Sequence, residues 1–600
     1  MQPAFERLSP RPRRCVRGEG EFVLGAAGTY SVECAPDEAQ PAVRSLQDAL
    51  GAGWRAAPHA GLATIRFLRV GALEGPQSYR LRVAPDGVLA EATDRAGLFY
   101  AAVTLAQLAR LSNGRLPACA IDDAPDFPAR GVMLDISRDK VPTMATLFGL
   151  VDRLAGLKIN QLQLYTEHAF AYSGHEEVWG RSSPVTGEEM RALDAYCRGR
   201  CVELVPNQNS FGHLERWLAL PRYQGLAELP QGGAPLPWGG VHEKPTSLCP
   251  TDPRSMAFLA GLYDELLPNF TSRLFNVGCD ETFDLRGEGR SRERVKQVGE
   301  GRVYLEFLQK IHALVSARGR RMAFWGDIII HHPELVPEIP PDAVALEWGY
   351  EADHPFDAHG AKFSAARVPF YVCPGTSSWN SLSGRTQNML ENLRSAAENG
   401  LKHGACGYLI TDWGDGGHWQ PLGVSFAAFT YGASLSWCLE ANRGIDVAQA
   451  SDAHLTEGLG RVLLELGDVY RLCGALRGNG TELFYILSKP ASRPVLPGVT
   501  GATLRAALAR VEALAAEVPP GGSALAQEAR HVAALLRAAC RRGIALLDGG
   551  LHAPETRRAL AEETDALIAE HERVWRLRNR EGGLSDSSAR LLRIRQEYGA

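Results

Sequence analysis

Eight short apolar runs recur between residues 131 and 410, and amphipathic helical patterns separate several of them. A strand that is buried on both faces reads as a continuous apolar run, and such strands alternate with helices in α/β folds. Eight β/α units predict an α/β fold of the (β/α)8 TIM-barrel type. The runs are 131–134, 161–165, 202–206, 274–277, 322–325, 344–347, 370–372 and 407–410.

Different patterns flank the predicted barrel on both sides. The preceding segment shows three alternating strand patterns at 63–70, 79–83 and 88–92, an Asp86-Gly87 hairpin signal and a helical pattern over 96–111, which indicates a small α+β domain. From about residue 447 the composition turns to Ala, Leu, Arg and Glu with helical periodicity. Because 600 residues are too many for one core, we predict three domains, at 1–124, 125–445 and 446–600.

The charge balance excludes two classes of partner. The net charge is only -5, from 64 basic and 69 acidic residues, so there is no basic surface for nucleic acid and no polybasic patch for a membrane. No apolar run of 18 residues occurs, and residues 1–18 lack the apolar core of a signal peptide. These observations predict a cytoplasmic protein that acts on a small, neutral molecule.

The twelve cysteines are scattered along the chain. Only Cys197 and Cys201 lie close together, one helical turn apart, and no second pair completes a zinc site. We therefore expect free thiols in a reducing compartment, and neither a metal ion nor a cofactor.

Two adjacent carboxylates, Asp280 and Glu281, follow the run 274–277. In parallel α/β folds, ligands bind outside the carboxyl ends of the strands, which is where these acids are expected. A solvent-exposed loop with two acids would show the same sequence. The residues at the other run ends therefore decide between a ligand site and such a loop. They carry further polar and aromatic candidates: Glu167, His213, Trp325, Trp348, Tyr371, Trp413 and Asp415, with Arg130 just before the first run.

Tryptophans beside acids at several run ends indicate a carbohydrate pocket, because sugars stack on aromatic faces while carboxylates bind their hydroxyls. Paired carboxylates at such a site suggest glycoside hydrolysis, in which retaining enzymes hold two carboxyls about 5 to 5.5 Å apart. Neighbouring side chains on an extended segment point apart, so Asp280 and Glu281 are poorly placed for that arrangement. A 2-acetamido sugar offers an alternative, since its own amide oxygen can attack the anomeric carbon.

The residues at the run ends resemble the motifs of glycoside hydrolase family 20, the β-N-acetylhexosaminidases. The similarity covers about residues 60–440, including the small domain that these enzymes carry before the barrel. It rests on the order of five motifs along the chain: Arg130-Gly131, Leu134-Asp135 with Ser137-Arg138, Gly212-His213, Gly278-Cys279-Asp280-Glu281 and Trp413-Gly414-Asp415.

The resemblance implies an exo-acting, retaining enzyme that removes terminal β-linked GlcNAc or GalNAc from an oligosaccharide or glycoconjugate through an oxazolinium-type intermediate. Glu281 would be the general acid and base, and Asp280 would orient the acetamido group. The implied substrate-binding residues are Arg130 and Asp415 at the sugar hydroxyls, Trp325, Trp348 and Trp413 around the acetamido group, Tyr371 at the amide oxygen, His213 as a supporting residue, and Glu167.

The chain departs from the family pattern at four positions. In the family's His-x-Gly-Gly-Asp-Glu motif, Asn276 replaces the His and Cys279 replaces the second Gly. Asp415 replaces a customary Glu, and Asn209 stands where many members have Asp. Two roles stay open for the C-terminal helices: completing the pocket or forming a homodimer.

Two other functions remain as alternatives. One is a catalytically inactive barrel that binds amino sugars. The other is a barrel glycosidase with an ordinary carboxylate nucleophile, for which Glu167 and Glu347 are candidates.

Overall fold

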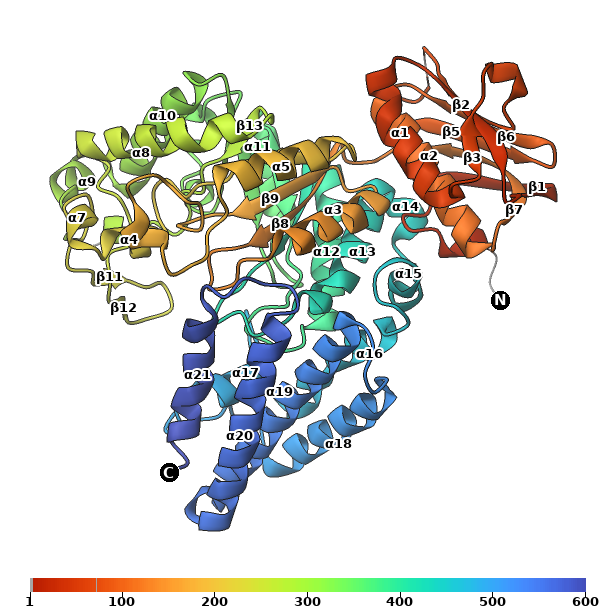
Figure 1. The fold of residues 1–600 in the computed structure, drawn as a ribbon. Coiled ribbons are helices and arrows are strands. Elements are labelled where there is room, and N and C mark those ends of the chain that lie inside the picture. The colour runs from red at the N-terminus through yellow and green to blue at the C-terminus, as the bar shows by residue number, and fades with distance from the viewer. Residues whose placement is uncertain (1–3, 72, 287, 600) are drawn as a thin grey trace.

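The computed structural model describes residues 4–71, 73–286 and 288–599, so the first three residues of the predicted N-terminal domain lie outside it. A sheet domain, a barrel and a group of long helices follow one another along the chain (Figure 1). The sheet domain lies to one side of the barrel, and the C-terminal helices lie below it in that view.

The N-terminal domain is a seven-stranded mixed sheet with two helices. The three predicted strands, the hairpin and the helix over 96–111 are confirmed as β4, β5, β6 and α2, with Ala84 opposite Gly87 at the hairpin. Four further strands and α1 were not predicted. The sheet order is β1 (Arg14–Val23), β7 (Arg115–Asp123), β5 (Tyr79–Ala84), β6 (Gly87–Ala92), β4 (Ile65–Arg69), β2 (Gly28–Glu33), β3 (Trp54–Ala56); the helices are α1 (Pro36–Leu50) and α2 (Arg95–Leu111).

The central domain is an eight-stranded parallel barrel, and all eight predicted strands are confirmed within two residues at either end. A parallel bridge between Asn207 and Asn276 links the first and last strands of the order and closes the barrel. The order is β10 (Glu203–Val205), β9 (Gln161–Tyr165), β8 (Ala129–Asp135), β17 (Gly407–Asp412), β16 (Phe370–Cys373), β15 (Val344–Trp348), β14 (Arg321–Trp325), β13 (Leu274–Asn276).

Amphipathic helices cover the outside of the barrel (Figure 1). In α3 the apolar residues Leu147, Leu150, Val151 and Leu154 are all buried, as the helical spacing predicts, and Thr143 caps its N-terminus. The helices of this region are α3 (Met144–Gly156), α4 (Glu176–Trp179), α5 (Gly187–Arg198), α6 (Glu215–Leu218), α7 (Pro221–Gln224), α8 (Pro253–Leu266), α9 (Arg292–Val298), α10 (Glu300–Ser316), α11 (Phe356–Ala365), α12 (Thr386–Lys402), α13 (Phe426–Trp437) and α14 (Leu439–Asn442), and a two-stranded hairpin, β11 (Ala234–Pro235) with β12 (Val241–His242), lies between α7 and α8.

A buried ion pair joins the N-terminal domain to the barrel. Lys158 Nζ lies 2.9 Å from Asp123 Oδ2, and both side chains are almost fully buried. The Trp437 indole donates a hydrogen bond to the other oxygen of Asp123 at 2.8 Å. Removing one member would leave a buried charge unpaired, so the pair fixes the contact between the two domains.

The C-terminal region is helical, as predicted, and the Pro519 to Gly522 and Gly549-Gly550 breaks separate its long helices. It packs against barrel loops on the carboxyl side of the strands: the Ser587 hydroxyl donates to the Gly417 carbonyl at 2.6 Å, and Thr143 N–H donates to the Arg578 carbonyl at 2.9 Å. The helices are α15 (Val447–His454), α16 (Gly460–Leu466), α17 (Glu482–Ser488), α18 (Gly501–Glu517), α19 (Ala524–Leu547), α20 (Pro554–Trp575) and α21 (Leu584–Gln596).

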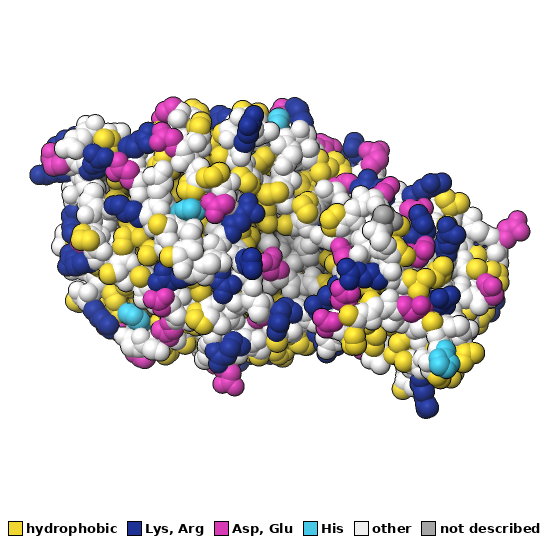
Figure 2. All heavy atoms as spheres, turned by 90° about the horizontal axis from the view of Figure 1, so that it is seen from above, with side chains coloured by type: hydrophobic (Ala, Val, Ile, Leu, Met, Phe, Trp, Pro, Cys, Tyr) yellow, Lys and Arg dark blue, Asp and Glu magenta, His cyan; other side chains and the backbone are white. Residues whose placement is uncertain are grey.

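The surface carries no single dominant charge on the face seen in Figure 2, where basic, acidic and apolar side chains are interspersed. Within the described ranges, every helix is too short or too polar to cross a lipid bilayer.

Candidate active site

The two predicted acids lie on a left-handed turn that follows β13. Gly278, Cys279 and Glu281 have φ angles of +68°, +74° and +49°, a region that side-chain-bearing residues rarely adopt. Gly278 cannot be replaced, because a Cβ there would lie 2.0 Å from Asn209 Oδ1. The turn is therefore held tightly against the loop that follows β10.

Asn276, a departure from the family pattern, stabilises this turn. Its side-chain oxygen accepts the Gly278 N–H at 3.0 Å, and its amide donates to Gln163 Oε1 at 2.9 Å inside the barrel. The second departure, Cys279, has its side chain fully buried in the main hydrophobic core. Both residues thus support the turn from below and do not face the pocket.

The turn makes the two carboxyls converge on one histidine. His213 Nε2 lies 3.2 Å from Asp280 Oδ2 and 3.3 Å from Glu281 Oε2. The expectation that these side chains point apart was wrong, because the segment is left-handed at Glu281 and not extended. Gly212 allows this approach, since a Cβ there would lie 2.3 Å from the Asp280 carbonyl oxygen.

The site holds a third carboxyl, that of Asp327, which the sequence analysis did not select. Asp327 accepts the Glu281 N–H at 3.1 Å. Burial and the neighbouring Asp280 charge raise the pKa of Asp327 well above its usual value. Asp280, Glu281 and Asp327 lie close together, and the neighbouring carboxyls favour the protonated form of Asp327.

His213 is expected to be a cation at neutral pH. Burial lowers its pKa, but Asp280 and Glu281 outweigh burial and raise the pKa well above 6.5. A group whose pKa is raised by folding stabilises the folded state. This contribution to stability is complete below about pH 6.5, and it is lost as the pH rises through the folded-state pKa.

Replacing His213 should therefore destabilise the protein more at pH 6 than at pH 9. The measurement is the thermal midpoint of the wild type and of His213→Asn at both pH values. A midpoint difference of the same size at pH 6 and pH 9 would contradict the assignment of a charged imidazole.

The three predicted tryptophans meet above the barrel core with a tyrosine that the sequence analysis missed. Trp325 and Trp413 lie 6.0 Å apart between ring centroids. Trp348 stacks on Tyr350 at 5.0 Å, and the Trp413 indole donates to the Tyr350 hydroxyl at 2.8 Å. Tyr350 follows Trp348 by two residues, so its position after the sixth run was the available signal.

The prediction that Tyr371 lies in the pocket was wrong. Its ring packs inside the barrel beside Gly407, and Gln161 and Arg321, each the first residue of its strand, influence the pKa of its hydroxyl. The hydroxyl therefore lies near the amino ends of the strands, opposite the catalytic turn. Tyr350 is the tyrosine at the correct end.

Exchanging the two tyrosines for phenylalanine separates these positions. Tyr350→Phe leaves the Trp413 N–H without its acceptor, which costs about 1 to 3 kcal/mol. On an aryl N-acetylglucosaminide, the substrate type that the family resemblance implies, we expect kcat/KM to fall about tenfold or more. Tyr371→Phe should change kcat/KM by less than about twofold, because its hydroxyl is remote from the pocket. A larger loss of kcat/KM in Tyr371→Phe than in Tyr350→Phe would instead support the prediction that Tyr371 lies in the pocket.

The prediction that Arg130 binds sugar hydroxyls was also wrong. It is fully buried at the amino end of β8, where its guanidinium donates to the Tyr100 hydroxyl at 3.0 Å and to the carbonyls of Lys158 and Phe127. It stacks over Trp437 at 4.9 Å and holds the domain junction.

Arg138, three residues after the carboxyl end of β8, is the arginine of the site. It lies 3.2 Å from Glu167 Oε1 and 3.8 Å from Asp415 Oδ1, and its guanidinium sits over the Trp413 ring at 5.1 Å. Asp135 braces this corner by accepting the Gly414 N–H at 3.0 Å. The predicted residues Glu167 and Asp415 thus meet around a cation that the sequence analysis did not select.

Burial raises the pKa of both acids beside Arg138, and the guanidinium opposes that rise. For Asp415 the balance gives a pKa of about 6. Its side chain keeps 36% of its surface exposed, so solvent moderates the effect of burial. Glu167 is also raised. Arg138 thus holds both acidic side chains at the same corner of the site.

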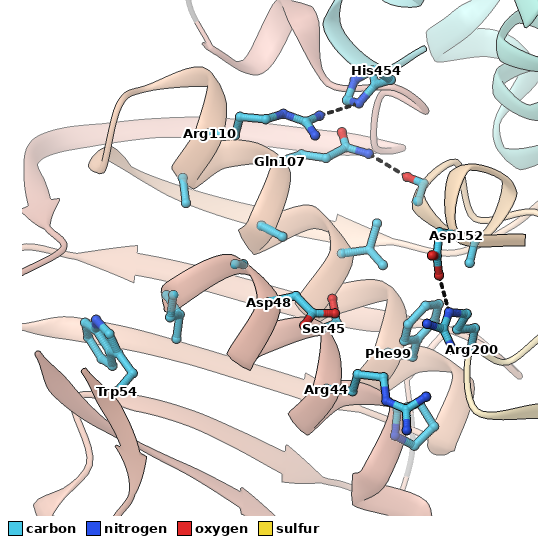
Figure 3. A pocket seen from close by; sticks show the side chains of 18 of the residues that line it. Arg44, Ser45, Asp48, Trp54, Phe99, Gln107, Arg110, Asp152, Arg200 and His454 are labelled. Carbon is cyan, nitrogen blue, oxygen red and sulfur yellow. Dashed lines mark hydrogen bonds and ion pairs between the residues drawn. The ribbon is translucent and has the colours of Figure 1, made fainter. Parts of the chain in front are cut away.

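A cavity of about 940 Å³ lies between the N-terminal domain and the barrel and not at the turn with Asp280 and Glu281 (Figure 3). The Arg110 guanidinium bonds to His454 at 2.6 Å, and the Gln107 amide donates to the Gly156 carbonyl at 2.9 Å. Burial and Arg110 lower the pKa of His454 to about 3, so the ring accepts this bond as a neutral imidazole. The Gln107 contact joins the N-terminal domain to the barrel, and the Arg110 contact joins it to α15 of the C-terminal region. We assign the cavity to this junction.

Two protein-family models match this chain. Residues 6–124 match the model of glycosyl hydrolase family 20 domain 2, and residues 127–395 match the family 20 catalytic domain. The chain belongs to glycoside hydrolase family 20. In this family-20 chain, the catalytic-domain match contains the turn with Asp280 and Glu281, and its end at residue 395 precedes the last barrel strand.

Characterised relatives share part of the chain. A beta-hexosaminidase of Akkermansia muciniphila is 29% identical over 287 residues, which cover 43% of this chain and 57% of that protein. A beta-hexosaminidase of Vibrio furnissii is 26% identical over 382 residues, covering 57% and 59%. The matches thus span less than two thirds of these relatives.

Solved structures show the same fold. The match to the Flavobacterium johnsoniae chitobiase covers 96% of this chain and 94% of the chitobiase chain, with a TM-score of 0.61 at 17% identity. The Streptomyces plicatus N-acetyl-beta-hexosaminidase covers 76% and 96%, with a TM-score of 0.59 at 21% identity. At these identities the likeness concerns the fold.

Proposed function

We propose that this family-20 protein is an exo-acting, retaining β-N-acetylhexosaminidase that removes terminal β-linked GlcNAc or GalNAc by substrate-assisted catalysis. The observation that carries the proposal is the turn on which Asp280 and Glu281 meet at His213, beside a cluster of tryptophans. The relatives named beta-hexosaminidase support it.

Each acid has a distinct role in the proposal. Glu281 protonates the leaving oxygen and later deprotonates water, and its side chain is the more exposed of the two at 31% against 7% for Asp280. Asp280 is buried and orients the substrate's acetamido group, whose oxygen attacks the anomeric carbon. The charged His213 between them offsets their mutual repulsion.

The remaining pocket residues bind the sugar. Trp325, Trp348 and Trp413 surround the acetamido group, and Tyr350 takes the role first given to Tyr371, donating its hydroxyl to the amide oxygen. The sugar hydroxyls are bound by Arg138, Glu167 and Asp415, with Arg138 in the role first given to Arg130.

An ordinary carboxylate nucleophile finds less support in this geometry. Leu346 and Trp348 pack in the barrel interior, while Ala345 packs in the outer core, so the alternation of β15 turns Glu347 outward. Glu167 is engaged by Arg138 and by the Tyr165 hydroxyl at 3.0 Å. An inactive sugar-binding barrel has no need for the exposed proton donor Glu281.

A panel of aryl β-glycosides with and without the 2-acetamido group tests the proposal. We expect release of the aryl group and of free N-acetylhexosamine from the GlcNAc and GalNAc derivatives only. Equal hydrolysis of plain glucosides would support the ordinary nucleophile, and absence of hydrolysis on the whole panel would support the inactive barrel.

Three predictions stay open alongside this function. We propose the domain division at 124/125 and 445/446, which limited proteolysis tests. All twelve cysteines are free thiols, which fits the cytoplasmic location predicted from the sequence. The homodimer is tested by sedimentation equilibrium.

A further inference from the structure

A second group of chemically active side chains lies outside the sugar pocket, at Glu347, His354 and His359. One ligand atom from each lies within 4.8 Å of the others. His354 Nε2 is 2.9 Å and His359 Nδ1 is 2.5 Å from the same oxygen, Glu347 Oε1. Their ring planes cross at 81°, so the two imidazoles approach this oxygen from different directions.

The surroundings of this group are built to hold it. Glu347 is only 2% exposed on the outer face of β15, while both histidine side chains keep 18% of their surface exposed. The His354 ring lies directly against Gly349, where a Cβ would be 2.0 Å from His354 Cγ. Glycine at this position lets the imidazole fold back onto the carboxylate.

Two imidazole nitrogens and one carboxylate oxygen form a donor set that is typical of zinc. We propose that Glu347, His354 and His359 bind one Zn²⁺ ion, with water in the fourth position. The ion takes the place of the two hydrogen bonds between the imidazoles and Glu347. It binds His354 Nε2 and His359 Nδ1 together with a Glu347 carboxylate oxygen. The partly exposed imidazoles provide the entry path for the ion.

A metal ion here would fasten the loop between β15 and α11. Tyr350 lies in this loop between the ligands Glu347 and His354, and Trp348 immediately follows Glu347. The ion would therefore stabilise the wall of the pocket without touching the substrate. The zinc site does not depend on the proposed activity.

Calorimetric titration of the EDTA-treated full chain with zinc chloride tests the site. We expect one Zn²⁺ per chain, a higher thermal midpoint with zinc bound, and at least about 100-fold weaker binding in His359→Ala. The matched control is His312→Ala. His312 also contacts a carboxylate, Asp342 at 2.8 Å, but belongs to no three-ligand group of the described residues, and its loss should leave zinc binding unchanged.

Cobalt substitution provides a readout on the wild type should the variant not fold. Co²⁺ in a four-coordinate site of nitrogen and oxygen ligands should give a visible absorption band that saturates at one equivalent and that zinc abolishes. No stoichiometric zinc binding in the wild type, or unchanged binding in His359→Ala, would overturn the proposal and leave a hydrogen-bonded cluster only.

Discussion

Glu281→Gln should lower kcat on an aryl N-acetylglucosaminide by about 10²- to 10⁴-fold, because general acid and base catalysis contributes that much. The amide is close in size to the carboxyl, so its contact with His213 Nε2 is kept while the transferable proton is lost. The loss should be smallest for the best leaving groups, which need the least protonation. The measurement is kcat across a series of aryl leaving groups.

A matched control is Glu440→Gln, which makes the same chemical change at a side chain that is 86% exposed. It should retain wild-type kcat. A Glu281→Gln enzyme within a few-fold of the wild type, with an unchanged thermal midpoint, would refute the role of Glu281.

Asp280→Asn should lower kcat/KM on acetamido substrates by about 10²- to 10³-fold, the usual effect of removing a preorganised electrostatic contact from a reaction centre. The buried carboxylate at this position is what would stabilise the positive charge of the cyclised intermediate. Steady-state kinetics on an aryl N-acetylglucosaminide measures the effect. A variant whose kcat/KM stays within a few-fold of the wild type would be inconsistent with substrate assistance.

Asp327→Asn provides a neighbouring comparison. The raised pKa of Asp327 favours its neutral form, and asparagine can still accept the Glu281 N–H, so the loss should not exceed about tenfold. A larger loss than that of Asp280→Asn would mean that the roles of the two aspartates are exchanged.

The barrel was predictable because its strands are buried on both faces and read as continuous apolar runs. The edge strand β1 was missed for the opposite reason: most of its residues are exposed, and its sequence, rich in Arg, Gly and Glu, shows no apolar alternation. The parts of the site at run ends, such as Glu167 and Trp348, were found because strand direction alone places them.

The errors in the predicted site have two causes: the end of the strand at which a residue lies, and the sign of the backbone φ angle. Arg130 and Tyr371 were placed by their proximity to a run, although a residue near the amino end cannot reach the carboxyl face; Arg138 and Tyr350 lie at the correct end. The convergence of Asp280 and Glu281 depends on a positive φ at Glu281, which is rare for a residue with a side chain. No periodicity in the sequence signals it.

The affinity of a thiazoline mimic of the cyclised intermediate tests the central claim, that the substrate's own acetamido group is the nucleophile. Calorimetry should show the mimic binding at least about 100-fold more tightly than N-acetylglucosamine to the wild type, as expected for an analogue of a reactive species. This advantage should largely disappear in Asp280→Asn. A mimic that binds no better than N-acetylglucosamine, or equally well to both proteins, would contradict the mechanism.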